Sequence, residues 1–194
     1  MLERQIAQDK SERIYAAFME CLTEGTYESI SIRKIAEKAG ITYSSLYYYF
    51  RDKEDILLSY FDHYSVMIET EMRSVLENLT EEERNGITLP QLTSLLLKKA
   101  STFHNERANC RVEVNFATLA MRNENLAKKY GEFTQRQIDL FQWAIEFCGI
   151  RTSNPRIAAW LINQQVLGYV MHYAIFSEEA PPDQLLALYD ASFC

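Results

Sequence analysis

The sequence of 194 residues contains few of the residues that interrupt helices, with only six glycines and four prolines. A turn-rich β fold uses more of both, so this scarcity favours long helices. Apolar residues make up 47% of the chain, which is enough for a hydrophobic core and argues against wholesale disorder. We therefore predict an all-α protein.

Cysteine and histidine are also scarce and widely spaced, and no CxxC pair occurs among the four cysteines and three histidines. Without a metal-ligand spacing we expect no bound metal and no cofactor. The sequence also shows no paired-carboxylate motif, nucleophile–base arrangement or phosphate-binding loop, so an enzyme is not expected. The isolated cysteines are typical of reduced, structural thiols in a cytoplasmic protein.

The sequence also predicts no membrane-spanning segment. The first residues are charged and contain no apolar run of the length found in signal peptides. The longest run without a charged side chain, Ile157–Phe176, includes Asn163, Gln164, Gln165 and His172. These polar side chains favour a buried helix over a membrane span. We expect a cytoplasmic protein with no membrane partner.

Basic residues are fewer than acidic ones, and the formal net charge is −7. A protein that coats nucleic acid or anionic membranes indiscriminately is therefore not expected. The segment 31–53 differs, because its five basic and two acidic side chains give it a net charge of +3. A basic segment in an acidic protein indicates a confined anionic partner.

What the sequence does contain is helical periodicity from end to end. We predict a small head, residues 1–52, followed by a larger body, residues 53–194, with about nine helices in all. Residues 80–86 are acidic and polar and are predicted to form a loop. The expected head helices run from Ser11 to Gly25, from after Ser31 to Ala39, and from Thr42 to Phe50; the body helices follow from Asp52 and at roughly 88–104, 109–121, 123–148, 155–177 and 182–193.

The second and third helices are short, and Gly40 supplies a tight turn between them. This order is the sequence form of a helix-turn-helix. Apolar residues of the second helix recur at helical spacing, and Leu46 and Phe50 point the third helix toward the same core. Three consecutive tyrosines, residues 47–49, wrap around the third helix, so at least one of them must face outward.

An outward tyrosine offers a rigid arm and a hydroxyl that can contact a phosphate or a base edge. The small Ser44 and Ser45 would let the helix lie close in a major groove, which is wide enough for an α-helix. Two alternatives remain open at this point. Helix-turn-helix geometry also occurs as plain packing, and exposed tyrosines also mark protein–protein interfaces.

The segment from Ile14 to about Leu57 resembles the DNA-binding head of the TetR family of transcriptional regulators. The matching pattern is dense and comprises Gly25, Tyr27, Ser31, Ile32, Ile35, Ala36, Ala39, Gly40, Ile41, Leu46, Tyr47, Phe50, Lys53 and Leu57. Three positions depart from the usual pattern: Ile30 replaces a frequent threonine, Ser44 a frequent glycine and Tyr49 a frequent histidine. None of the three disturbs the apolar pattern.

The resemblance implies a double-stranded DNA operator as the partner and a set of contact residues on the head. Lys53 and the pair Ser31 and Arg33 would contact or flank the phosphate backbone. The remaining contacts implied by the resemblance lie on or just before the third helix: Thr42, Tyr43, Ser44, Ser45, Tyr47 and Tyr48.

The helix expected over Ile157–Phe176 is apolar on nearly all sides, and such a helix has to be covered on every side. A homodimer would supply the second cover, and the TetR resemblance implies the same arrangement. The alternative is a monomer whose own chain wraps this helix. The predicted dimer residues are Trp160, Val166, Tyr169, Val170, Tyr173, Leu185, Leu188 and Tyr189. Two recognition helices in a dimer would read a palindromic operator.

Aromatic residues with a few interspersed polar groups run through the body. This composition suits a small-molecule pocket and equally an ordinary helical core. The resemblance implies a ligand-binding body, and hence a ligand-responsive regulator, most simply a repressor released by a small, largely apolar effector of unknown identity. The pocket residues predicted on this basis are Phe61, Tyr64, Phe103, Phe116, Phe141, Trp160, Gln164 and Tyr169.

Overall fold

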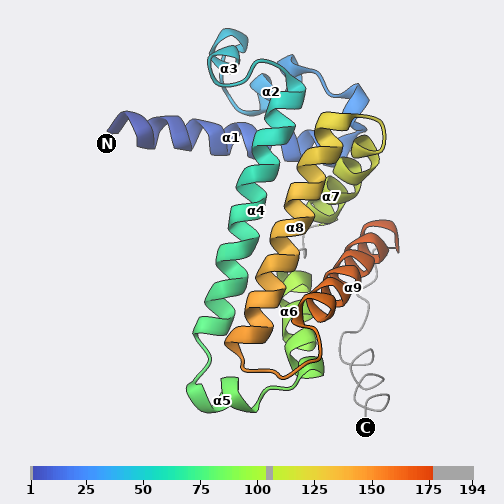
Figure 1. Ribbon diagram of the computed structural model, residues 1–194. Helices are drawn as coiled ribbons and strands as arrows, with labels where there is room; N and C mark the ends of the chain where they lie inside the picture. Colours follow the sequence, from blue (N-terminus) through green and yellow to red (C-terminus); the bar gives the residue numbers. More distant parts are fainter. Residues whose placement is uncertain (1, 104–106, 177–194) are drawn as a thin grey trace.

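The computed structural model describes the backbone of residues 2–103 and 107–176, and the side chains of residues 10–100 and 110–176. Over these residues the chain forms α-helices and no strand, which confirms the predicted all-α fold (Figure 1). The elements are α1 (Leu2–Glu24), the 3-10 turn η1 (Tyr27–Ser29), α2 (Ile32–Lys38), α3 (Tyr43–Tyr49), α4 (Lys53–Glu77), α5 (Glu81–Gly86), α6 (Leu89–Phe103), α7 (Arg107–Ala120), α8 (Glu124–Phe147) and α9 (Pro155–Phe176).

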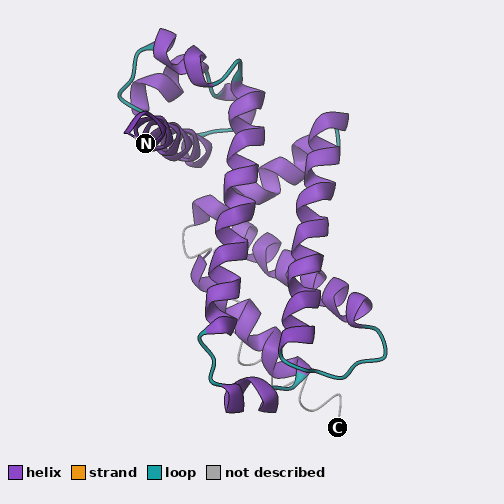
Figure 2. Cartoon of the chain, turned by 60° about the vertical axis from the view of Figure 1, so that its left-hand side comes forward, coloured by secondary structure: helices purple, strands orange, loops and turns teal. Residues whose placement is uncertain are grey.

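The three helices α1, α2 and α3 gather at one end of the molecule, and α3 is the helix farthest from the body (Figure 1). The long α4 leaves this head and runs beside α8 toward α5 at the opposite end. α7 packs against α1, α8 and α9, and so connects the head to the body. The same division into a head and a long helical body is visible in the second view (Figure 2).

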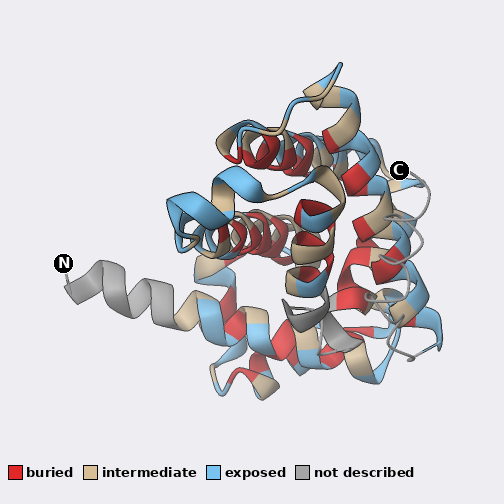
Figure 3. Ribbon diagram, turned by 90° about the horizontal axis from the view of Figure 1, so that it is seen from below, coloured by how far each residue is buried: buried red, intermediate tan, exposed pale blue. Residues whose placement is uncertain are grey.

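One continuous apolar core joins the two parts. Buried residues line the inward faces of the helices while exposed residues cover their outer faces (Figure 3). In the head, Phe18 of α1, Ile35 of α2 and Leu46 of α3 are fully buried together with Leu57 of α4. Because α4 contributes to both ends of this core, a displacement along α4 would be felt in the head.

Two boundaries differ from the sequence predictions. α1 begins at Leu2 rather than near Ser11, and residues 81–86 form α5 where a loop was expected. α5 has a reciprocal capping box, since Glu83 N donates to Thr80 Oγ1 at 3.2 Å while Thr80 N donates to Glu83 Oε2 at 2.8 Å. Three glutamates in its first turn lie near the positive end of the helix dipole and so stabilise the helix. The helix predicted at 182–193 lies outside the described residues.

None of the helices in the described ranges combines the length and the apolar character needed to cross a bilayer.

Candidate nucleic-acid interface and effector body

The helix-turn-helix is built from local capping signals. Ser31 Oγ accepts a hydrogen bond from Lys34 N at 3.2 Å and so begins α2, and Thr42 Oγ1 accepts one from Ser45 N at 3.1 Å and begins α3. Each side chain satisfies a backbone N–H that has no partner within its own helix. Both short helices therefore start where the sequence predicted.

The turn between them is a Schellman motif centred on Gly40. Gly40 N donates to Glu37 O at 3.1 Å and Ile41 N donates to Ala36 O at 3.0 Å, which closes the end of α2. Gly40 has φ of 64°, a left-handed conformation that glycine adopts without steric cost. Arg13 of α1 donates from Nη2 to Ala39 O at 2.6 Å and fixes this turn against α1.

α3 has one face in the core and one in solvent. Leu46 is 0% exposed and the following Phe50 is buried, so these two residues hold the helix against α1 and α2. On the other side Tyr48 is 84% exposed, and Tyr43 and Tyr47 are each 44% exposed. Tyr49 is half-buried against the core. Three exposed tyrosines on one short helix form a contiguous patch, which is more informative than single exposed rings.

Two of the exposed tyrosines form a pair. The hydroxyl oxygens of Tyr43 and Tyr47 lie 3.0 Å apart, and their rings meet edge to face with centroids 4.9 Å apart. Hydrogen bonding to Tyr43 raises the pKa of Tyr47, so this hydroxyl keeps its proton for donation. The guanidinium of Arg33 on α2 lies 5.4 Å from the Tyr43 ring centroid, within cation–π range. One surface thus combines a cation with two oriented phenols.

The other predicted DNA contacts divide into two groups. Ser44 is exposed beside the tyrosines, and its hydroxyl lies 3.1 Å from that of Thr42. Ser31 and Thr42 are exposed but already use their hydroxyls as helix caps. A capping hydroxyl can still meet a phosphate through its remaining lone pair and proton. All these DNA contacts stay predictions.

Lys53 has a structural task that the sequence did not reveal. Its Nζ donates to Tyr27 O at 2.5 Å and to Ile30 O at 3.0 Å, and it lies 4.1 Å from the Tyr27 ring centroid. Burial lowers the pKa of this ammonium group. Lys53 therefore ties the start of α4 to the η1 turn, and its predicted phosphate contact would have to share the ammonium with these carbonyls.

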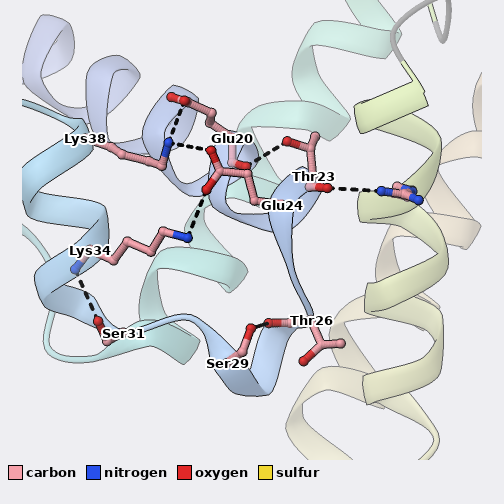
Figure 4. A network of polar contacts seen from close by, with 9 residues as sticks. Glu20, Thr23, Glu24, Thr26, Ser29, Ser31, Lys34 and Lys38 are labelled. Atoms are coloured by element: carbon pink, nitrogen blue, oxygen red, sulfur yellow. Dashed lines mark hydrogen bonds and ion pairs between the residues drawn. The ribbon is translucent and has the colours of Figure 1, made fainter.

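A charged network joins α1 to α2 (Figure 4). Lys38 Nζ contacts Glu20 Oε1 at 2.5 Å and Glu24 Oε1 at 2.8 Å, while Lys34 Nζ contacts Glu24 Oε2 at 2.9 Å. Glu24 is held by both lysines at once. Hydrogen bonds from Lys38 and then Lys34 lower the pKa of the Glu24 carboxyl from its ordinary 4.5 to about 2.

This network should make the stability of the head depend on acid. A depressed carboxyl pKa stabilises the fold above the unfolded value and loses that effect as the pH falls toward the folded value. Between pH 7 and about pH 4.5, wild type should therefore unfold at a higher temperature than Glu24→Gln. As the pH falls from 4.5 toward 2, the difference in Tm should shrink, because both chains then carry a neutral group at residue 24. Thermal unfolding followed by circular dichroism measures this.

A matched control is Glu37→Gln, which changes an exposed acid on α2 outside the network. Its Tm difference from wild type should not follow this pH profile. A Tm difference for Glu24→Gln that is the same at pH 7 and pH 2.5 would contradict the role assigned to the two lysines.

In the body, aromatic side chains pack between α4, α7 and α8. The rings of Phe61 and Phe116 are stacked with centroids 3.6 Å apart, and Phe133 meets Phe61 edge to face at 5.0 Å. Tyr64 lies at the same place, fully buried, and its hydroxyl donates to Glu113 Oε2 at 3.4 Å. Burial, reinforced by the Glu113 charge, raises the pKa of Tyr64 well above its ordinary value. The body therefore contains a carboxylate inside an aromatic shell.

The predicted pocket residues do not form one group. Phe61, Tyr64 and Phe116 come together in this aromatic shell, and Phe141 is buried elsewhere in the same apolar core. Trp160 and Gln164 are exposed on α9. The side chain of Phe103 lies outside the described ones. Phe61, Tyr64 and Phe116 pack against one another, which is the arrangement of an ordinary helical core.

α9 resolves into two apolar faces. Its inner face is buried and comprises Ala159, Ile162, Asn163, Val166, Tyr169, Val170 and Ala174. Its outer face is exposed and comprises Ile157, Trp160, Leu161, Gln164, Gly168, Met171, His172 and Ile175, a set that recurs every three or four residues and so forms one stripe. We call this set the outer stripe. An exposed stripe with this many apolar side chains is a candidate interaction surface.

This division corrects part of the predicted dimer seam. Val166, Tyr169 and Val170 are buried within the protomer, and Tyr173 is half-buried, so these side chains belong to the core of the chain itself. Trp160 does lie on the outer stripe. Leu185, Leu188 and Tyr189 lie outside the described residues. The sequence missed Leu161 and Gly168, because a helix that is apolar on nearly all sides does not show which side faces solvent.

The architecture now defines a class. A three-helix head exposes the second helix of a helix-turn-helix, and α7 and a long α4 connect it to a helical body. A helix-turn-helix whose second helix is exposed is the arrangement of many DNA-binding domains. Residues 14–60 match the family model of bacterial regulatory proteins, tetR family. The head of this chain therefore matches the TetR family of transcriptional regulators, in agreement with the resemblance found in the sequence.

A curated relative is the fatty acid metabolism regulator protein of Bacillus subtilis (strain 168), which is 29% identical over 116 residues. The match spans 59% of this chain and 58% of the relative, so the chain spans less than two thirds of the length of that relative. The relatives are transcriptional regulators and not enzymes, in agreement with the sequence prediction.

Solved structures share the fold over nearly the whole chain. The transcriptional regulator FadR from Bacillus subtilis in complex with stearoyl-CoA superposes with a TM-score of 0.70 at 22% identity, covering 91% of this chain and 96% of that one. GusR of Salmonella enterica gives 0.72 at 19% identity, covering 93% and 92%. The fatty acid degradation regulator FadR from Bacillus halodurans gives 0.66 at 21% identity, covering 91% and 94%. At these identities the likeness establishes the fold.

Proposed function

We propose that this chain is a cytoplasmic repressor that binds a palindromic operator as a homodimer and releases it when an acyl effector occupies the body. Residues 1–52 would bind DNA, and residues 53–194 would bind the effector and the second subunit. The proposal rests on the TetR-family head, on the outer stripe of α9 and on the relatives described above.

One observation carries the DNA-binding part: α3 presents three solvent-exposed tyrosines at the free end of the head. Tyr43, Tyr47 and Tyr48 point away from the core, and Arg33 lies beside them. α3 lies at the end of the molecule away from the described helices α5, α6 and α9, where a duplex could approach it (Figure 1). A major groove admits such a helix, and phenol hydroxyls can then bond phosphate oxygens and base edges.

A homodimer is supported by the outer stripe. A symmetric interface uses the same patch on both subunits, and a helix stripe of this kind can pair with its own copy about a twofold axis. Gly168 lies within the stripe with open space around it, so a partner helix could approach the α9 backbone closely there. Two heads held by such a seam would read two half-sites of one operator.

The chemical class of the effector is supported by the relatives. FadR from Bacillus subtilis binds stearoyl-CoA in the solved complex, and the curated relative regulates fatty acid metabolism. We therefore propose a fatty acyl thioester for this chain, in agreement with the expectation of a largely apolar effector. Its acyl chain would enter the aromatic body by displacing side chains such as Phe61 and Phe116 from their present stack.

The test begins with selection of bound fragments from genomic DNA, followed by affinity measurements on the best fragment. Tyr47→Ala should lower the DNA affinity about tenfold or more. Tyr47→Phe keeps the ring and loses only the hydroxyl, so its DNA affinity should lie between those of Tyr47→Ala and wild type. The control Asn85→Ala changes an exposed side chain on α5, at the opposite end of the molecule from α3 (Figure 1), and should change nothing. Wild-type binding should fall by roughly 10³-fold between 50 and 200 mM salt if several phosphates are contacted.

A helical interaction module that uses its tyrosine face for a protein partner is the competing function. It predicts no selected DNA fragment and little response to salt. Equal DNA affinity for wild type and for the double variant Tyr47→Ala with Tyr48→Ala would remove α3 from the interface.

A further inference from the structure

A groove of about 410 Å³ lies where the head meets the body. Its walls come from the end of α1 and the following turn, from α7, and from the end of α9, with Leu22, Val114 and Ile175 as apolar lining. Arg111 and Asn115 of α7 supply polar groups, one helical turn apart on the same face. The volume lies within the range of small-molecule sites, about 300–1,000 Å³.

Arg111 makes the polar link across this groove. Its Nη1 donates to Thr23 O at 3.1 Å, a carbonyl in the last turn of α1. The last carbonyls of a helix lack partners within the helix and carry its negative end, so a guanidinium stabilises them. A guanidinium has five N–H donors in a planar fork that suits carboxylate and phosphate oxygens. The same side chain can therefore hold α1 or hold an anion.

The surrounding charges favour an anion. Glu24 also lines the groove, but Lys34 and Lys38 hold its carboxylate and lower its pKa to about 2, so its charge is already compensated. The charged lining therefore consists of Arg111, a cation, and Glu24, a carboxylate that is already paired with two lysines. Asn115 adds a neutral amide that can donate to a second ligand oxygen.

We propose that this groove binds a small amphipathic anion, a carboxylate or phosphate group on a short apolar body, and that the anion competes with Thr23 for Arg111. The apolar body would lie on Leu22, Val114 and Ile175, and the anionic group on Arg111 and Asn115. The effect on operator DNA rests on the proposed function, whereas binding in the groove does not.

α7 would carry this event into the body. Arg111 is followed within two helical turns by Glu113, which is hydrogen-bonded to Tyr64 of α4, and by Phe116, which stacks on Phe61 of α4. Loss of the bond to Thr23 would release the end of α1 from the helix that anchors it. The groove thus couples head and body through differential contacts in two states, which is the requirement for an allosteric site.

Titration calorimetry with octanoate, octyl phosphate and 1-octanol tests the groove without DNA. The two anions should bind wild type at least tenfold more tightly than 1-octanol. Arg111→Gln should erase this preference, and Arg111→Lys should retain part of it. Thr26→Trp, an exposed lining position that leaves Arg111 in place, should weaken all three by filling the groove. Arg136→Gln, which removes an arginine of α8 paired with Asp62, is the control and should bind like wild type.

Equal affinity for the anions and 1-octanol, or anion affinity that survives both Arg111→Gln and Thr26→Trp in folded protein, would overturn the site. Preference for only one of the two anions would assign the ligand to carboxylates or to phosphates.

The effect on DNA is measured with the operator fragment. Saturating octanoate should lower the DNA affinity of wild type by about 5- to 150-fold, the usual range of coupling, and the DNA affinity of Arg111→Gln by less than twofold. Anion binding with no DNA binding at all would leave the groove standing and reject the proposed function, whereas anion binding without an effect on DNA affinity would reject the switch.

Discussion

Leu161→Glu is expected to make the protein monomeric and to lower its affinity for operator DNA by about 100-fold or more. Leu161 is 50% exposed on the outer stripe of α9, so the glutamate is tolerated in the free protomer. In a twofold dimer the substitution places two carboxylates in one apolar seam, where each loses hydration without gaining a partner. DNA affinity falls because two linked heads bind far more tightly than one. Analytical ultracentrifugation and DNA titration measure the two effects.

Two other glutamate substitutions separate this effect from misfolding. Asn85→Glu changes an exposed side chain on α5, at the end of the molecule opposite the head (Figure 1), and should leave both the dimer and DNA binding intact. Val166→Glu places a charge where the native side chain is 6% exposed inside the protomer, and it should unfold the chain. If Leu161→Glu still sediments as a tight dimer, the outer stripe is not the seam.

Phe116→Ala is expected to lower the free energy of unfolding by about 3–5 kcal/mol, the usual cost of removing a buried phenyl ring. Phe116 is 0% exposed and stacks on Phe61 at 3.6 Å, so its removal leaves a hole between α4 and α7. For a domain of this size each kcal/mol corresponds to roughly 2–4 °C in Tm. Denaturant unfolding followed by circular dichroism measures the free energy directly.

The same experiment decides between the two interpretations of the aromatic body. Phe147→Ala removes a half-buried ring that stacks on Trp143 at the end of α8, and it should cost clearly less. A loss below about 1 kcal/mol for Phe116→Ala would mean that this ring borders open space, as a preformed pocket requires. A loss near the full value means that an effector has to displace packed rings and that its affinity is reduced by that cost.

The head could be predicted from the sequence because its determinants are local. Ser31 and Thr42 cap α2 and α3, Gly40 closes the turn, and Leu46 and Phe50 fix which face of α3 is buried. Each of these signals acts within about four residues, so no knowledge of the rest of the chain is needed. The capping box of α5 is equally local, but the acidic and polar composition of residues 80–86 predicts a loop, and the structure has a short helix there.

The residue pattern alone predicts a helical protein and places a tyrosine-bearing helix on a helix-turn-helix head. Which side of α9 faces solvent, in contrast, depends on tertiary packing. The sequence of a helix that is apolar on all sides does not show which face is buried. Val166 is buried and Leu161 is exposed because α6, α7 and α8 pack against one side of α9. The bond from Arg111 to Thr23 likewise joins residues 88 positions apart, and no local rule relates them.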